Sequence, residues 1–188
     1  MRRALTLALA LALAAPALAA PAKVKPVSIN LKLDAVDRGT ADDLSREMAA
    51  GKLKRADKRN PAHGKLFLHL AATHTDPAVV AAALRGMSST FARPGAKGRR
   101  AKARAKVDAN YTKVVLARLA DASPLVKGGA IDASKKLLSA KKPDQKVIDA
   151  LVATAKAGDD AVKIAVIQAF FNVKAVQRPK SMKGPHKK

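Results

Sequence analysis

Three segments of the chain share one local pattern, and this repetition constrains the fold more than any other feature. Residues Asp76–Val79 (DPAV) match Ser123–Val126 (SPLV), and Asp159–Val162 (DDAV) follow the same plan. Each segment starts with a residue type whose side-chain oxygen can cap a helix, and proline suits a first helical turn because no donor is lost there. Apolar pairs then follow in register after each valine: Ala83-Leu84, Ala130-Ile131 and Val166-Ile167. The pattern predicts three helices of one kind.

Each of these helices is preceded by another segment with a helical apolar stripe. The first of these begins near Pro61, with Asn60 as its cap, and short turns separate each stripe from the helix that follows. The stripes consist of Leu66, Phe67 and Leu70, then Val115, Leu116 and Leu119, then Val147, Ile148 and Leu151. Short turns force antiparallel pairs, and a pair with one apolar face must stack on another to bury it. We therefore predict an all-α fold with helix pairs at about 60–91, 108–139 and 143–173.

The spacing of the repeated unit indicates a family. The aligned valines lie 47 and 36 residues apart. Antiparallel helix pairs at this period resemble HEAT repeats, and Asp-Pro-x-Val followed by Ala-Leu is the closest part of the match. The resemblance implies a short right-handed α-solenoid of about three helix pairs over residues 60–173, which acts as a binding scaffold. The arginine that this family carries early in its second helix is missing, because Val80, Lys127 and Lys163 stand there. A plain bundle of six or seven helices is the alternative fold.

The first nineteen residues have the composition of a secretory signal peptide. Arg2 and Arg3 precede an Ala/Leu run over residues 4–15, and Ala17–Ala20 offers a small-x-small cleavage pattern. Cleavage after Ala19 keeps Pro21 out of the first mature position. The run is too short to span a membrane, because a transmembrane helix needs about 20 apolar residues. We predict a signal peptide at 1–19 and an exported protein, periplasmic or secreted, with no membrane span after its removal.

The next forty residues predict an arm and a small helix. Residues 20–38 read as a Pro/Ala/Lys leader and an extended arm, in which Val27–Asp34 alternates strictly between apolar and polar residues. A period of two is typical of a strand with one buried face. No later segment resembles a partner strand, so the arm either packs on the helices or pairs with the sheet edge of another chain. Residues 39–59 predict a capping helix from Gly39-Thr40 to Gly51, followed by a basic connector.

The charge of the chain predicts an anionic partner or surface. Lys and Arg number 37 against 14 Asp and Glu, a formal net charge of +23. Cations gather in a basic insert at 92–107 and in a basic, disordered tail at 174–188. The candidate residues for binding an anionic partner are Arg93, Lys97, Arg99, Arg100, Lys102, Arg104, Lys106, Arg178, Lys180, Lys183, Lys187 and Lys188. The alternative is that the charge only keeps an Ala-rich chain soluble.

The sequence carries no catalytic, metal-binding or cofactor-binding motif. Cysteine is absent, and the four histidines, His63, His69, His74 and His186, lack the i,i+4 spacing of a helical metal site. Gly128-Gly129 lies inside a predicted helix, where close packing against another helix accounts for it. We therefore predict no enzymatic activity, no cofactor and no metal ligands.

Three functions remain compatible with the sequence. The leading hypothesis is an exported, non-enzymatic HEAT-like scaffold that mediates protein–protein interaction, while its insert and tail bind an anionic partner or surface. One alternative is a general polyanion-binding protein (nucleic acid, anionic lipid or glycan) whose helices act as a carrier; another is an accessory subunit of an envelope enzyme. Nucleic-acid binding would be nonspecific, because Tyr111 is the only Tyr, Trp is absent and stacking platforms are lacking.

The end of the last predicted helix suggests a contact. Val162–Val173 is apolar on more than one side, whereas a terminal helix should have a polar outer face. Either the basic tail covers this helix, or this end of the array meets a partner.

Overall fold

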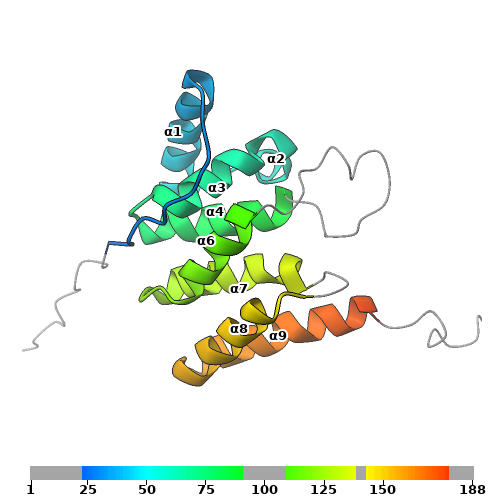
Figure 1. Ribbon diagram of the computed structural model, residues 1–188. Coiled ribbons are helices and arrows are strands. Elements are labelled where there is room, and N and C mark those ends of the chain that lie inside the picture. Colours follow the sequence, from blue (N-terminus) through cyan, green and yellow to red (C-terminus); the bar gives the residue numbers. More distant parts are fainter. Residues whose placement is uncertain (1–22, 91–108, 139–142, 178–188) are drawn as a thin grey trace, which may run out of the picture.

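The computed structural model describes residues 23–90, 109–138 and 143–177 (Figure 1). Within these ranges the chain forms eight α-helices, one short 3-10 helix and no strand, so the all-α prediction is confirmed. The elements are α1 (Ala35–Ala49), α2 (Arg55–Arg59), η1 (Pro61–His63), α3 (Gly64–Thr73), α4 (Pro77–Thr90), α6 (Ala109–Leu119), α7 (Pro124–Leu138), α8 (Gln145–Ala157) and α9 (Asp160–Gln177).

The helices of the repeated units pack beside their equivalents. The first helices contact in the order α3, α6, α8, and the second helices contact in the order α4, α7, α9. Each first helix also packs on the second helix of its own pair. Helix α1 packs on α3 and α4 at one end of the molecule, and α8 and α9 form the opposite end (Figure 1). Every interior helix therefore buries its apolar face against neighbours of the same kind.

Polar side chains cap helices where the sequence places capping residues. The Ala78 N–H donates to Asp76 Oδ1 (2.8 Å), and the Val162 N–H donates to Asp159 Oδ1 (2.9 Å). Asn60 and Asp144 accept in the same way from Ala62 and Lys146, each at 3.0 Å. These oxygens satisfy backbone donors that have no partner within the helix. The predicted starts of the second helices, immediately after residues 76, 123 and 159, match the observed ones.

A small residue in each second helix lies seven positions after the aligned valine. These residues, Gly86, Ala133 and Ala169, are all buried. At Gly86 a Cβ would lie 2.8 Å from Cγ of Phe67 in α3, and at Ala133 the carbonyl accepts from the Tyr111 hydroxyl of α6 (2.8 Å). Burial raises the pKa of Tyr111 above its usual range, which keeps this hydroxyl a donor. In the first two units, the small residue lets the aromatic side chain of the first helix approach the second helix closely.

The first helix begins earlier than the sequence suggests. Helix α1 starts at Ala35 rather than at Gly39-Thr40, because Asp34 Oδ1 accepts from the Asp37 N–H (2.7 Å) and caps it there. Thr40 lies within the helix and donates instead to the carbonyl of Val36 (3.0 Å). The left-handed stop is confirmed, because Gly51 has a φ of 67°. The predicted basic connector contains the short helix α2 and a buried Leu53.

The segment Val27–Asp34 is extended but belongs to no sheet, so the prediction of a strand is wrong in that respect. Its alternation is used against helices: Leu33 is buried, and Val27, Ile29 and Leu31 pack against the core. The Val27 N–H donates to the carbonyl of Ala72 (2.7 Å), so backbone polar groups find partners without a neighbouring strand. Of the two expected roles for the arm, packing on its own helical body is the observed one.

The two adjacent glycines of α7 lie in different surroundings. A Cβ at Gly129 would lie 3.0 Å from the carbonyl oxygen of Ala81 and 3.1 Å from its Cα, both in α4. A Cβ at Gly128 would meet nothing within 4 Å. The interpretation of close helix packing is therefore confirmed for Gly129 alone.

This difference predicts opposite effects of two alanine substitutions. Gly128→Ala should raise the free energy of unfolding by up to about 1 kcal/mol, because alanine favours a helix by roughly that amount. Gly129→Ala should be about 1–3 kcal/mol less stable than the Gly128 variant, because its methyl group crowds the main chain of α4. Urea denaturation of both variants measures the difference, and equal stabilisation by the two substitutions would contradict the close α4–α7 contact.

Candidate functional site

A buried arginine joins three parts of the chain. Arg118, at the end of α6, is only 1% exposed. Its Nε donates to the carbonyl of Ala71 and its Nη2 to that of Ala72, both at 2.8 Å. Its Nη1 donates to the carbonyl of Lys25 (2.6 Å) and to Oδ2 of Asp121 (3.4 Å). One guanidinium thus connects α6 with α3, with the arm and with the turn that follows α6.

The position of Arg118 satisfies the end of a helix. Helix α3 ends at Thr73, so the carbonyls of Ala71 and Ala72 lie in its last turn and have no intrahelical partner. A cation is also favourable at the negative end of the helix dipole. Burial lowers the pKa of Arg118, and the Asp121 carboxylate opposes this effect, so the guanidinium stays charged at neutral pH. The charge is therefore paired, as a buried charge must be.

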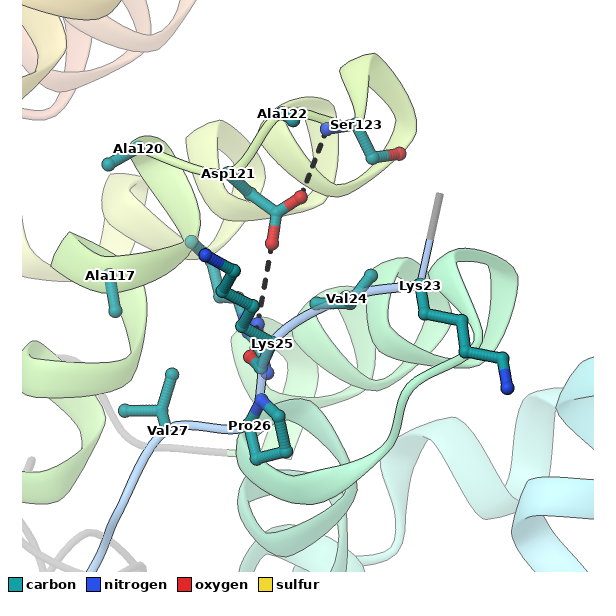
Figure 2. Close-up of a pocket in the computed structure, with 11 residues that line it drawn as sticks. Lys23, Val24, Lys25, Pro26, Val27, Ala117, Ala120, Asp121, Ala122 and Ser123 are labelled. Atoms are coloured by element: carbon teal, nitrogen blue, oxygen red, sulfur yellow. Dashed lines mark hydrogen bonds and ion pairs between the residues drawn. The ribbon is translucent and has the colours of Figure 1, made fainter. Parts of the chain in front are cut away.

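A hollow of about 510 Å³ lies between the arm and the α6–α7 turn. Figure 2 shows arm residues Lys23–Val27 on one side and turn residues Ala120–Ser123 on the other. Two of the charged residues that line it are paired, because Asp121 accepts from the Ser123 N–H (3.0 Å) and pairs with Arg118; the other two are Lys23 and Lys25 of the arm. Each nitrogen of that guanidinium donates within the protein as well. The Arg118 guanidinium thus anchors the arm beside this hollow.

The carboxylate of Asp132 links α4 and α7 at the surface. Asp132 of α7 lies 3.6 Å from Nε of Arg85 in α4 and 2.6 Å from Nζ of Lys135. The Ser88 hydroxyl of α4 donates to the backbone carbonyl of Asp132 (3.3 Å). Partly exposed pairs of this kind contribute about 0–1 kcal/mol each. These contacts show which side chains of α4 face α7.

The described histidines make separate local contacts. His74 Nδ1 accepts from the Asp76 N–H (3.0 Å), so its proton lies on Nε2, 3.0 Å from the Ser45 hydroxyl. His63 Nε2 lies 3.1 Å from Nδ2 of Asn60. Among the residues with described positions, no group of three His, Asp or Glu side chains could hold a metal ion. These contacts hold turns and helix ends in place, and His186 lies outside the described residues.

All of the sequence-predicted anion-binding residues lie outside the described ranges. Those of the insert fall within 91–108 and those of the tail within 178–188. Sequence reasoning did not identify Arg118. The available signal was its spacing, because Arg118 follows Val114 and Val115 by four and three positions and so lies on the apolar stripe of α6. A cation on an apolar stripe must find buried acceptors, and this one does.

The last helix pair exposes apolar side chains. Phe171, Ile164 and Ile167 of α9 are 69%, 55% and 53% exposed, and Val152 of α8 is 41% exposed. Val162, Val166 and Ala169, on the opposite side of α9, are buried. The prediction that this helix is apolar on more than one side is therefore confirmed.

Comparison with known proteins identifies no relative. No protein-family model matches the chain, and no curated protein or solved structure matches it. The HEAT resemblance thus stays a prediction drawn from the repeated pattern. In the described part of the chain, no helix is both long enough and apolar enough to cross a membrane.

The Arg118 contacts predict a large loss of stability when they are removed. Arg118→Leu should lower the free energy of unfolding by about 2–4 kcal/mol, because the buried Ala71 carbonyl loses its donor and Asp121 loses its cation. Hydrogen exchange at the Val24 and Val27 amides should also accelerate as the arm detaches. The matched control is Arg85→Leu, which removes a partly exposed pair and should change stability by less than about 1 kcal/mol. Similar losses in the two variants would rule out a special role for Arg118.

His69 predicts a pH dependence of a defined sign. Burial lowers its pKa below the ordinary 6.5; Arg38 adds to this effect and Asp42 opposes it. Below pH 6.5 the unfolded chain therefore binds more protons than the folded protein. The free energy of unfolding consequently decreases as the pH is lowered. His69→Gln should remove this part of the dependence. Denaturation of both proteins over a pH series checks it, and parallel stability curves would refute the assignment.

Proposed function

We propose that this protein is an exported, non-enzymatic HEAT-like scaffold that mediates protein–protein interaction. In this proposal its helix pairs form a short right-handed α-solenoid, and its basic insert and tail bind an anionic partner or surface. The observation that carries the proposal is the order of contacts, α3–α6–α8 beside α4–α7–α9, with each pair in the same register. Stacked pairs of this kind provide extended surfaces, and repeat proteins use such surfaces to bind partners.

The internal packing supports a rigid scaffold. The aromatic side chains Phe67 and Tyr111 are fully buried at the repeated small positions, and Gly129 holds α7 against α4. The Arg118 contacts also fix the arm on the helices. A rigid surface loses little conformational entropy on binding, which favours a scaffold over a chain that orders when its partner arrives.

The net charge of +23 supports the anionic partner and also supports the alternative, a general polyanion-binding protein. The two functions differ in their salt dependence. Binding through released counterions weakens steeply as the salt concentration rises. Binding of a protein through the helical surface is less dependent on salt, because dissolved ions screen mainly the interactions between exposed charges. Crosslinked pull-down from the cell envelope or medium, followed by a salt series, therefore distinguishes them: a protein retained at high salt supports the scaffold.

The proposed role of the insert predicts a site-specific loss of affinity. Changing its seven cations (Arg93, Lys97, Arg99, Arg100, Lys102, Arg104 and Lys106) to glutamine should weaken binding to a polyanion by at least about tenfold at low salt. The salt dependence should also become shallower, because fewer counterions are released. Titration of a sulfated glycan, duplex DNA and anionic phospholipid vesicles measures both quantities.

A matched variant distinguishes the insert from net charge alone. It changes seven exposed cations of the arm, α2 and the adjoining turns to glutamine: Lys23, Lys32, Lys52, Lys54, Arg55, Lys58 and Arg59. Both variants lose the same formal charge, so equal weakening would reject a specific role for the insert. Unchanged affinity of the insert variant for all three polyanions would reject any role for it.

A further inference from the structure

Helix α4 contacts α7 through three residues spaced along one face. A Cβ at Gly129 of α7 would lie 3.0 Å from the carbonyl oxygen of Ala81 and 3.3 Å from Cβ of Leu84. Ser88 donates to the carbonyl of Asp132, also in α7. Ala81, Leu84 and Ser88 follow the aligned Val79 by two, five and nine positions. This face is therefore the one that α4 turns toward α7.

Helix α9 carries its three exposed apolar residues at the same positions. Ile164, Ile167 and Phe171 follow the aligned Val162 by two, five and nine positions. The equivalents of Ile167 in the other two helices, Leu84 and Ile131, are 0% and 1% exposed, whereas Ile167 is 53% exposed. Helix α9 thus carries apolar residues at the positions by which α4 contacts α7. Its side chains at positions two and nine are larger than those of α4, and no described helix packs against them.

The composition of this face favours an apolar helix as its occupant. Ile164, Ile167 and Phe171 carry no charge, and Gln168 between them is neutral. An anionic partner attracted by the net charge would find no cation among them. The composition of residues 178 to 188, with Pro179, Gly184, Pro185 and one large apolar residue, is unfavourable for such a helix. A second copy of the chain does, in its own α9.

The opposite end of the molecule limits how two copies can meet. Helices α1 and α2 both pack on α4, and α1 also packs on α3. The α9 face of one copy therefore cannot continue the stack by contacting α4 of the next copy. We therefore adopt the self-complementary arrangement across a two-fold axis.

We propose that the exposed face of α9 is the interface of a symmetric homodimer, in which Ile164, Ile167 and Phe171 of the two copies pack together. In an antiparallel pair of α9 helices, Ile164 lies opposite Phe171 of the second copy, and Ile167 and Gln168 lie at the two-fold axis. The interface is small, so dimerisation belongs to the micromolar range. Net charges of +23 on both copies oppose association, and salt screens this repulsion while leaving apolar contacts intact.

Sedimentation of the purified protein from about 1 to about 500 μM, in salt from about 0.1 to about 1 M, tests the proposal. The expected result is a monomer–dimer equilibrium that strengthens with salt. Ile167→Asp should weaken it by at least about 30-fold, because a charge would be buried at the axis. The control Val36→Asp, on the 79% exposed Val36 of α1, should leave dimerisation unchanged. Monomer at every concentration would overturn the proposal, as would equal weakening by the two substitutions.

A second measurement does not depend on a destabilising substitution. The chain has no cysteine, so Gln168→Cys introduces a single thiol at the axis. Mild oxidation should then give a disulfide-linked dimer faster and more completely than oxidation of the matched Val36→Cys variant. Equal crosslinking of the two variants would show random collision and would also overturn the interface. Circular dichroism of each variant confirms that it folds.

Discussion

The charged contact between Arg118 and the end of α3 is the interaction on which the other parts of the structure depend. The guanidinium supplies donors to the carbonyls of Ala71 and Ala72 and to the arm at Lys25. It thereby holds the first and second helix pairs together on the side where the arm lies. A neutral residue of the same size would leave the Ala71 carbonyl buried without a partner, which costs about 1–3 kcal/mol, and the Ala72 carbonyl with the Val27 N–H alone. Packing of apolar surfaces brings the helices together, but this contact determines how α6 is placed on α3.

The repeated pattern predicted most of the helices because it combines three independent signals: caps, apolar periodicity and short turns. Those signals are local, and they located α4, α7 and α9 correctly. The strand prediction failed and Arg118 was missed for the same reason, which is that both depend on contacts distant in sequence. The alternation of Val27–Asp34 cannot reveal whether its apolar face meets a sheet or a helix. The role of Arg118 depends on carbonyls 46 and 47 residues earlier in the chain. Its position on an apolar stripe predicts burial, but not the acceptors.

The register of the second helices explains both the interior and the exposed surface. The position seven residues after the valine is small in every unit, and in the first two units it lies against the aromatic side chain of the preceding helix. In α4 the positions two, five and nine after the valine contact α7, and in α9 the same positions form an exposed apolar stripe. The two ends of the molecule therefore differ. Helix α1 covers one end, and its own residues Ala41, Leu44 and Met48 are buried there. At the other end, α9 leaves its apolar face exposed.

The arm has a consequence for how the chain reaches its folded state. Lys25 and Arg118 are 93 residues apart, so the contact between them closes a very long loop. Closing such a loop is slow compared with forming the adjacent helix hairpins, whose contacts are local. The helices can therefore assemble while the arm is still free. The arm is then among the last parts of the chain to become ordered, and its docking completes folding.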